Sequence, residues 1–304
     1  MPRCKPCVRC WACRSKNEAF SHVMSLSKNA LALSAVPLAA WGAVPAVVAA
    51  TSAADVGELR AGSGYLKGYL APADLPDSLA LMPAPPVEGS PALAADVAAF
   101  TALTRMQGTP RGDIAVSDAG LRFPQAASVF SCALGMPISE EATPHLNMLL
   151  RRSLTDTALA TYKAKNRYVR MRPFVREKTA SCTPQEEASL AKDGSYPSGH
   201  AAIGWGWALL LAELSPEHKD AILQRGLAYG QSRAICGVHW QSDIEAGRLV
   251  ASTVVAQLHA NPIFDAQMAA ARTEIVKARS AGTPTRAACI AEAAAIERSS
   301  SFAP

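Results

Sequence analysis

The apolar residues of the chain recur mainly at intervals of three and four, the spacing that places side chains on one face of an α-helix. Three segments show such a face: Leu93, Val97, Phe100 and Leu103; Leu146, Leu150 and Leu154; Ile203, Trp207, Leu210, Leu211 and Leu214. Ser90-Pro91 and Thr143-Pro144 precede the first two, and each pair offers a capping hydroxyl before a first-turn proline. We find no convincing set of alternating strands after residue 90. The pattern therefore predicts a single all-α domain, with 201–214 as a buried core helix.

Two stretches depart from the helical pattern. Six prolines lie between residues 72 and 91, and they predict an extended arm that can wrap the surface without supplying core helices. The last residues, 299–304, predict a frayed end. We therefore expect one domain over residues 55–280, with 281–304 as a C-terminal tail.

The start of the chain has the features of an export signal. From Met24 a polar start with Lys28 is followed by an apolar, alanine-rich stretch and then by small residues that suit signal peptidase. We interpret 24–54 as a Sec-type signal peptide, cut after about Ala50 or Ala54, which predicts a periplasmic mature protein. The alternative is an uncleaved membrane anchor, which the prolines within the apolar stretch disfavour.

Composition narrows the class of protein. The 304 residues are 49% apolar, enough to bury a substantial core, and they carry a formal charge of +5. That excess lies within residues 1–54, the leader, and the rest of the chain has 24 basic and 24 acidic residues. A nucleic-acid footprint needs a basic surplus on the folded part, so nucleic-acid binding is disfavoured. No uncharged apolar run after residue 54 reaches the roughly 18 residues of a membrane span, so we expect no stable membrane insertion after signal cleavage.

The eight cysteines form two groups of four. The first group has repeated C-x2-C spacing: Cys4, Cys7, Cys10 and Cys13. Such spacing can supply thiolates to a metal, but a metal cluster in front of an export signal has no obvious purpose. We expect Met24 to be the true start and 1–23 to be extra sequence. The second group can form up to two disulfides in an exported chain, in three connectivities that the sequence leaves open: Cys132, Cys182, Cys236 and Cys289.

The candidate chemistry is concentrated in three motifs. In the first, Lys165 and Arg172 are seven residues apart. On one helix that spacing places both cations on the same face, two turns apart, where they can grip one anion before Pro173 ends the helix. The alternative is a solvated basic face or charges that meet the helix C-terminus, and to it we assign the other cations of the segment: Arg167, Arg170 and Arg176.

The second motif, Pro197-Ser198-Gly199-His200, leads into the predicted core helix. A Ser-Gly turn at a buried helix N-terminus presents free backbone N–H groups and the positive end of the helix dipole, which together bind oxyanions. Gly199 lets the backbone approach a ligand closely. Taken alone, the tetrapeptide is equally compatible with an ordinary serine N-cap followed by a core histidine.

The third motif has the spacing Ser232-Arg233-x5-His239-x3-Asp243. We expect a helix after it, with Ser242 and Glu245 in capping-box spacing. Asp243 can then accept one imidazole N–H of His239 and leave the other ring nitrogen outward as a nucleophile or base. The alternative is that Asp243 stabilises its helix N-terminus. We assign the other histidines to structure or surface: His22, His145, His218 and His259.

The three motifs together resemble, in order and spacing, the signature of the type 2 phosphatidic acid phosphatase (PAP2) superfamily. The longer string from Gly194 to His200 is similar to the mark of its soluble branch, the bacterial class A nonspecific acid phosphatases. The Tyr-Leu-Ala-Pro stretch at 69–72 and the Ile-Cys-Gly before His239 are similar to that branch as well. The resemblance covers about 64–260, and it departs at Ala201, where that branch is expected to have threonine.

The resemblance implies an all-α acid phosphatase that hydrolyses a broad range of small phosphate monoesters. It implies a homo-oligomer. It also implies that no metal or other cofactor is needed, since arginines would supply the positive charge that a metal ion would otherwise supply. The substrate phosphate would be bound by five residues: Lys165, Arg172, Ser198, Gly199 and Arg233.

The same resemblance implies the catalytic roles. His239 would attack phosphorus to form a phosphohistidine, and Asp243 would hold and charge-stabilise its ring. His200 would protonate the leaving alkoxide and then activate water. Because one histidine must be neutral while the other is protonated, we expect a bell-shaped pH profile on the acid side of neutral.

Three other classes of protein could contain a similar anion site, and the sequence disfavours each of them. A vanadium haloperoxidase uses the same pocket for vanadate, but such chains are usually much longer. A membrane lipid phosphatase of the superfamily would need several membrane spans. A periplasmic phosphate-binding protein would explain an anion site without catalysis, but it would not need two histidines plus Asp243, and it would show two α/β lobes.

Overall fold

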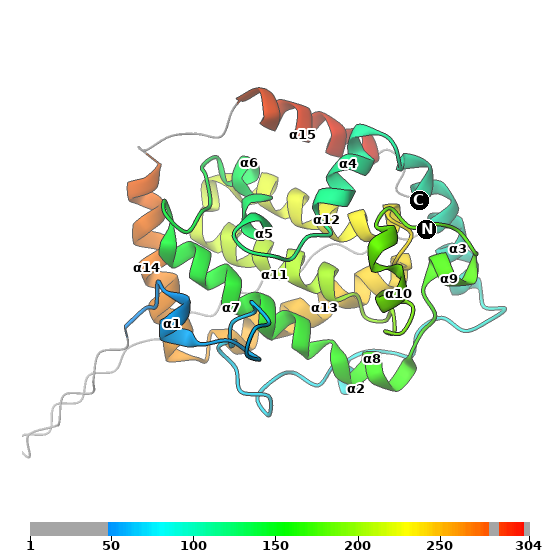
Figure 1. The fold of residues 1–304 in the computed structure, drawn as a ribbon, viewed down its shortest axis with the longest axis horizontal. Helices are drawn as coiled ribbons and strands as arrows, with labels where there is room; N and C mark the ends of the chain where they lie inside the picture. Colours follow the sequence, from blue (N-terminus) through cyan, green and yellow to red (C-terminus); the bar gives the residue numbers. More distant parts are fainter. Residues whose placement is uncertain (1–47, 280–285, 301–304) are drawn as a thin grey trace, which may run out of the picture. The chain divides into compact units, whose positions relative to one another are not determined.

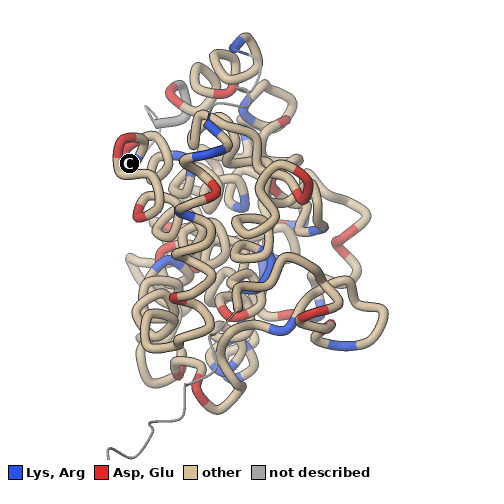
Figure 2. Tube along the Cα trace, turned by 90° about the vertical axis from the view of Figure 1, so that its left-hand side faces the viewer, with Lys and Arg blue, Asp and Glu red and all other residues tan. Residues whose placement is uncertain are grey.

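The computed structural model describes residues 48–279 and 286–300, and these form an all-α domain, as the sequence predicts (Figure 1). Within them the strand-like pairing is limited to one antiparallel bridge between Glu58 and Leu66. None of the helices in this part of the chain is long and apolar enough to cross a membrane. Basic and acidic residues are interspersed along the trace (Figure 2). The four leader cysteines and most of the expected signal peptide lie outside the described residues.

Four long helices build the centre of the domain: α7 (Pro144–Ala160), α11 (Gly199–Leu214), α12 (Lys219–Ile235) and α13 (Gln241–Leu258). Of these, α11 contacts the other three and lies among them in Figure 1. Trp207 of α11 is fully buried, and its indole N–H donates to the carbonyl of Leu150 in α7 at 2.9 Å. The predicted core helix is therefore confirmed.

The other α-helices of the described residues are α1 (Ala53–Val56), α2 (Ser78–Leu81), α3 (Pro91–Leu103), α4 (Pro110–Ser117), α5 (Gln125–Ser128), α6 (Ser131–Leu134), α8 (Tyr162–Tyr168), α9 (Pro173–Arg176), α10 (Glu187–Leu190), α14 (Pro262–Ala278) and α15 (Arg286–Ser300). Three short 3-10 helices join them: η1 (Thr104–Met106), η2 (Pro184–Glu186) and η3 (Pro216–His218). Helix α14 packs against α7, and α15 packs against α4. The segment expected to be a C-terminal tail thus contains a helix.

The two predicted helix starts differ in how they are capped. Ser90 caps α3 through its side chain, as predicted. The hydroxyl of Thr143 does not cap α7, because it bonds to the backbone of Ser139 instead. The carboxylate of Glu274, from α14, accepts two free N–H groups of the first turn of α7 at 3.0 and 2.8 Å. A cap expected from the neighbouring residue is therefore supplied by a helix distant in sequence.

The proline-rich arm runs extended over the helices, interrupted only by α2, as the sequence predicts. The buried carboxylate of Asp156 in α7 accepts the N–H groups of Tyr69 and Leu70 at 2.9 and 3.0 Å. Farther along the arm, the carbonyl of Pro83 accepts the hydroxyl of Tyr196, at 2.9 Å. The residues just before the arm are therefore tied to α7, and the arm itself is tied to the residue before the second motif.

Two disulfides select one of the three open connectivities. Cys132 pairs with Cys289, which joins α6 to α15. Cys182 pairs with Cys236, which joins the chain just before η2 to the end of α12. The second disulfide thus lies within the third motif, between Arg233 and His239.

Helix α13 lies unusually close to the start of α11, and Gly247 makes this approach possible. A Cβ at Gly247 would lie 2.4 Å from the carbonyl oxygen of Ser198 and 3.2 Å from the Cβ of Ala201. The first of these neighbours is backbone, which cannot move aside as a flexible side chain can. Gly247 therefore sets the spacing between the second and third motifs.

We predict that Gly247→Ala lowers the free energy of unfolding by about 1–3 kcal/mol, the usual cost of overpacking a core. The gain in helix propensity, about 1 kcal/mol, does not offset a backbone clash. Urea unfolding followed by circular dichroism measures the change. Gly120→Ala is the matched control, because its Cβ would meet only the carbonyl of Ser117 at 3.6 Å. Equal stability of the two variants would contradict the prediction.

Candidate active site

The first motif does not form one helix, so the predicted arrangement of Lys165 and Arg172 is wrong. Helix α8 ends at Tyr168, and Arg172 is the extended residue before α9, with ψ 150°. The helix ends where Val169 adopts a left-handed backbone (φ 42°), and Pro173 accounts only for the extended Arg172, because a proline disfavours helical backbone at the residue before it. The two side chains nevertheless converge on Asp193, at 3.6 Å from Lys165 and 3.2 Å from Arg172.

Both cations are buried and are held by backbone carbonyls. The ammonium of Lys165 donates to the carbonyl of Gly194 at 2.7 Å, and burial lowers the pKa of Lys165 to about 8, with Asp193 acting against that shift. The Nε of Arg172 donates to the carbonyls of Leu190 and Asp193 at 2.8 and 3.0 Å. The chain over 190–194 thus wraps around both cations.

The second motif forms the start of α11, as predicted. The Oγ of Ser198 accepts the N–H of Ala201 at 3.3 Å, and Gly199 and His200 occupy the first turn. The N–H of Ser198 donates to the carbonyl of Asp243 at 2.9 Å. This bond joins the second motif directly to the third.

His200 is partly buried beside the end of α4. Its Nε2 donates to the carbonyl of Ala119 at 3.0 Å, so Nε2 carries the proton of the neutral ring and Nδ1 carries none. Burial and the positive charge of Arg233 hold the pKa of His200 well below its ordinary value. The ring is therefore neutral near pH 7 when no anion is bound.

Arg233 differs from the other cations of the site in its lack of hydrogen bonds within the part of the chain that the structure describes. Its side chain is fully buried, yet none of its three guanidinium nitrogens has a hydrogen-bond partner within the described part of the chain. The nearest carboxylate oxygen belongs to Glu186, at 3.9 Å. Burial lowers the pKa of Arg233 to about 10, so the group remains charged at physiological pH. A buried, charged and unbonded guanidinium is suited to receive an anion.

Its neighbour in the motif, Ser232, is bonded elsewhere: its hydroxyl donates to the carboxylate of Asp118 at 2.7 Å. One turn at the end of α4 therefore contacts two motifs. Asp118 binds Ser232 of the third motif, and Ala119 binds the ring of His200 in the second.

His239 lies between a cation and a carboxylate. Its Nε2 is 3.0 Å from Nη1 of Arg172, and a guanidinium can only donate, so Nε2 accepts and the proton of the neutral ring is on Nδ1. That nitrogen faces Oδ2 of Asp243 at 3.4 Å. Burial, followed by the charges of Arg172 and Lys165, holds the pKa of His239 well below its ordinary value.

The start of α13 differs from the expected capping box. Trp240 is the N-cap, and its N–H donates to Oδ2 of Asp243 at 2.8 Å. Ser242 lies inside the first turn, where its N–H and its hydroxyl bond to Asp96, so the expected pairing with Glu245 is wrong. Asp243 therefore both stabilises its helix start and faces His239.

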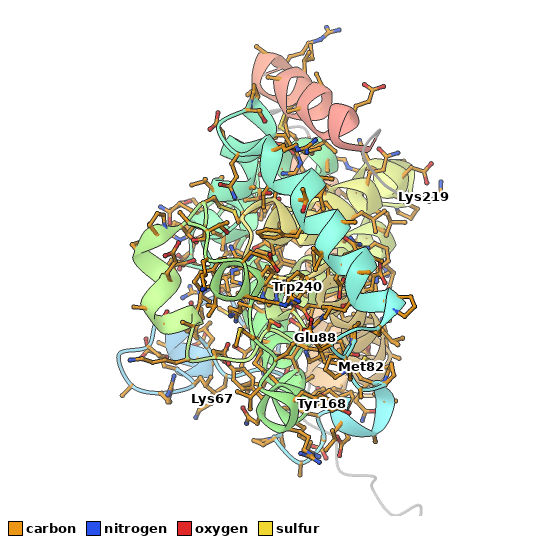
Figure 3. All side chains as sticks on the ribbon, turned by 90° about the vertical axis from the view of Figure 1, so that its right-hand side faces the viewer. Lys67, Met82, Glu88, Tyr168, Lys219 and Trp240 are labelled. Carbon is orange, nitrogen blue, oxygen red and sulfur yellow. A yellow bond between two sulfur atoms is a disulfide. The ribbon has the colours of Figure 1, made fainter. Side chains whose placement is uncertain are left out.

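Arg170, which the sequence suggests is solvated, is a buried bridge between two carboxylates. It donates to Oδ1 of Asp243 at 2.6 Å and to Oδ2 of Asp96 at 2.7 Å, and its side chain is 8% exposed. Its guanidinium lies 5.5 Å from the ring centre of Trp240, the interior residue labelled in Figure 3. One signal in the sequence points to this bridge: Asp96 follows Leu93 by three residues on an otherwise apolar helix face.

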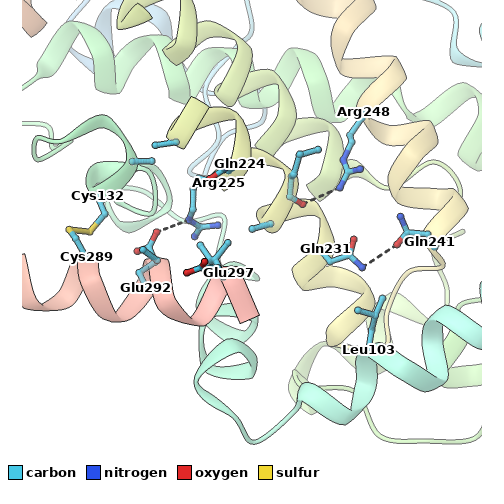
Figure 4. A pocket seen from close by; sticks show the side chains of 16 residues that line it. Leu103, Cys132, Gln224, Arg225, Gln231, Gln241, Arg248, Cys289, Glu292 and Glu297 are labelled. Carbon is cyan, nitrogen blue, oxygen red and sulfur yellow. Dashed lines mark hydrogen bonds and ion pairs between the residues drawn. A yellow bond between two sulfur atoms is a disulfide. The ribbon is translucent and has the colours of Figure 1, made fainter. Parts of the chain in front are cut away.

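The described residues also contain a cavity of about 670 Å³ bordered by α12, α13 and α15, whose lining includes Arg225, Arg248 and Glu292 (Figure 4). Its lining contains none of the eight predicted site residues. The candidate active site is therefore a compact cluster of buried groups, separate from this cavity.

Comparisons with known proteins agree with the motifs. A family model described as the PAP2 superfamily matches residues 143–262. A non-specific acid phosphatase of Providencia stuartii is 46% identical over 210 residues, which cover 69% of this chain and 85% of that protein. An acid phosphatase of Zymomonas mobilis is 42% identical over 220 residues, which cover 72% and 83%. A non-specific acid phosphatase of Salmonella typhimurium is 38% identical over 208 residues, which cover 68% and 83%.

The fold is all-α, and the three motifs lie together around the start of α11. These features define the PAP2 type of phosphatase domain. The chain belongs to the bacterial class A non-specific acid phosphatases of the PAP2 superfamily, and it is an acid phosphatase.

The buried bridge generates a prediction: Arg170→Gln lowers the free energy of unfolding by about 3–5 kcal/mol near pH 7, because it leaves two buried carboxylates without their cation. Burial already raises the pKa of Asp243, and Arg170 acts against that shift. Without Arg170 the folded pKa of Asp243 rises further above its unfolded value. The variant should therefore be least stable at high pH and recover stability as the pH falls through that folded pKa.

Urea unfolding at several pH values measures this loss. Arg167→Gln is the control, since Arg167 belongs to the same motif but is exposed. Asp96→Asn added to Arg170→Gln should restore part of the stability, because it removes one uncompensated charge. A loss that is the same at all pH values, or that Arg167→Gln reproduces, would refute the proposed bridge.

Proposed function

We propose that this acid phosphatase hydrolyses a broad range of small phosphate monoesters through a phosphohistidine on His239, without a metal ion, after export to the periplasm. The observation that carries the proposal is Arg233, whose buried guanidinium has no hydrogen-bond partner among the described residues. The phosphoryl group of a substrate would supply the missing acceptor.

The phosphate site consists of cations and backbone donors. Lys165, Arg172 and Arg233 would face the phosphoryl oxygens, and the Ser198-Gly199 turn would add N–H groups and the positive end of the α11 dipole. Such fixed donors stabilise charge as it develops during phosphoryl transfer, which is the largest contribution in many enzymes. These cations take the place that a metal ion has in other phosphatases, and this is our reason for proposing a metal-independent reaction.

In the first chemical step, Nε2 of His239 attacks phosphorus and the bond from phosphorus to the ester oxygen breaks. The neutral ring has its lone pair on Nε2, because Nδ1 holds the proton and faces Asp243. As the ring bonds to phosphorus it becomes positive, and the carboxylate of Asp243 stabilises that charge. His200, protonated, gives its proton to the leaving alkoxide.

In the second step a water molecule attacks phosphorus and the bond from nitrogen to phosphorus breaks. His200, now neutral, takes a proton from the water as it attacks. Inorganic phosphate leaves, and His239 and His200 return to their starting protonation states. One ester and one water therefore yield one alcohol and one phosphate.

The range of substrates follows from what the site contacts. All five predicted binding residues would face the phosphoryl group, and we assign none of them to the alcohol. This is our reason for proposing broad rather than narrow specificity, and it agrees with the name non-specific acid phosphatase that relatives carry.

Export is supported by the two disulfides, of which Cys182–Cys236 lies within the domain and Cys132–Cys289 joins the domain to the segment after it, because disulfides persist in oxidising compartments such as the periplasm. We propose that 24–54 directs this export and that 55–280 is the catalytic domain. A homo-oligomer, as the family resemblance implies, belongs to the same proposal.

We predict that His239→Ala abolishes hydrolysis of p-nitrophenyl phosphate and prevents trapping of an acid-labile phosphoenzyme, because the nucleophile is gone. His200→Ala should slow alkyl phosphates more than aryl phosphates, because a phenolate needs less protonation, and phosphoenzyme should accumulate. Acid-quenched labelling with a radioactive phosphate ester measures the intermediate.

The control for both variants is His259→Ala, which changes a histidine on the surface and should leave the rate unchanged. The wild-type assay is run with excess chelator. Substantial activity in a folded His239→Ala protein would disprove the nucleophile, and loss of wild-type activity on chelation would disprove metal independence.

The pH profile gives a second prediction. Burial and the neighbouring cations lower the pKa of both His239 and His200, so the range in which one ring is neutral and the other protonated lies on the acid side of 6.5. Activity should fall at low pH as His239 becomes protonated and at higher pH as His200 loses its proton. A bound phosphoryl group offsets the cations and raises both pKa values, so the kcat profile should lie at higher pH than the kcat/KM profile. Coincident profiles, or an optimum above neutral pH, would contradict this assignment.

A further inference from the structure

Asp193 is a carboxylate inside the cluster of cations that is proposed to bind phosphate. Its Oδ2 is 3.2 Å from Nη2 of Arg172 and 3.6 Å from Nζ of Lys165. The residue directly precedes Gly194 of the second motif, and the sequence motifs do not include it. A negative charge among groups that would bind a negative substrate calls for an explanation.

The hydrogen bonds of Arg172 show which of its donors a ligand could use. Its Nε donates to two carbonyls, and its Nη1 donates to the carbonyl of Val238 at 3.0 Å and to His239. Its Nη2 donates to the carbonyl of Gly194 at 3.4 Å and to the carboxylate of Asp193. Four of these six acceptors are backbone carbonyls held by the fold and a fifth is the ring of His239. Before the chemical step, the carboxylate of Asp193 is therefore the acceptor of Arg172 that a phosphate oxygen can replace without moving the backbone, since Nη1 loses its acceptor on His239 only when Nε2 bonds to phosphorus.

The exposed fractions of Arg172, Lys165 and Asp193 also indicate that Asp193 is the group that can move aside. Those of Arg172 and Lys165 are 2% and 4% exposed, whereas that of Asp193 is 39% exposed. The cations are therefore fixed within the protein, while the carboxylate has access to solvent. Rotation of the Asp193 side chain would uncover Nη2 of Arg172 and the ammonium of Lys165 together.

We propose that Asp193 is an internal competitor of phosphate, a carboxylate that occupies part of the phosphate site when no substrate is bound. A phosphate monoester displaces this side chain to reach Arg172 and Lys165, and the carboxylate returns as inorganic phosphate leaves. The apparent affinity for phosphate is then lowered by the fraction of molecules in which Asp193 occupies the site. This inference rests on the phosphate site of the proposed function.

The test is the nearly isosteric variant Asp193→Asn, which removes the charge. If Asp193 occupies the site nine times in ten, the dissociation constant of inorganic phosphate falls about tenfold, and KM for p-nitrophenyl phosphate falls with it. Calorimetric titration of the full chain with inorganic phosphate measures binding independently of turnover. Asp193→Ser is a second variant in case the first does not fold, and thermal unfolding checks both.

Asp220→Asn is the matched control, since it removes one exposed carboxylate, which forms an ion pair with its neighbour Lys219. It should leave the phosphate affinity unchanged. Phosphate binding that is unchanged or weaker in both Asp193 variants would overturn the inference, because the carboxylate would then serve to position Arg172 and Lys165. If the wild-type protein neither binds phosphate nor hydrolyses the ester, the proposed function itself fails; if it does both, the Asp193 variants alone decide.

Discussion

The structure depends on the burial of three cations, Lys165, Arg172 and Arg233, beside one helix start. A buried charge is costly unless it is hydrogen-bonded or paired. Lys165 and Arg172 meet this requirement with carbonyls of the segment around 190–194, which the fold turns inward. Among the described residues Arg233 has no hydrogen-bond partner, and its ion pair with Glu186 is long, at 3.9 Å. The unfavourable charge is held in place by the packed core of α7, α11, α12 and α13, and in the proposed function it would give the site its affinity for phosphate.

Burial and the neighbouring cations together set the protonation of the two histidines. Burial most, and then nearby cations, lower the pKa of His239 and of His200, so both rings are neutral near pH 7 while the site is without an anion. A phosphoryl group that neutralises the cations makes protonation of either ring easier. In the proposed mechanism, the arrival of substrate would in this way make His200 easier to protonate, so that it could act as the acid. The charges that bind the phosphate would therefore also regulate the proton transfers, and no additional titrating group is needed.

The second and third motifs are joined at two places, which explains how groups distant in sequence stay aligned. The N–H of Ser198 donates to the carbonyl of Asp243, and Gly247 allows α13 to lie against the same turn. The disulfide from Cys182 to Cys236 fixes the start of the segment that continues to Asp193. Arg170 adds a buried link from Asp243 to Asp96 of α3. The nucleophile candidate is thus supported from several helices at once.

The sequence by itself determined the helical class, the core helix α11 and the three motifs, because these depend on periodicity and on residues close together in the chain. It did not determine the partners of those residues. Glu274 caps α7 in place of Thr143, Arg170 is buried between two acids, and Asp193 meets Lys165 and Arg172 across a broken helix. Each of these contacts joins residues whose proximity follows from the packing of whole helices. Only the tertiary structure decided them, because a local pattern specifies which face of a helix is buried but not which side chain lies opposite to it.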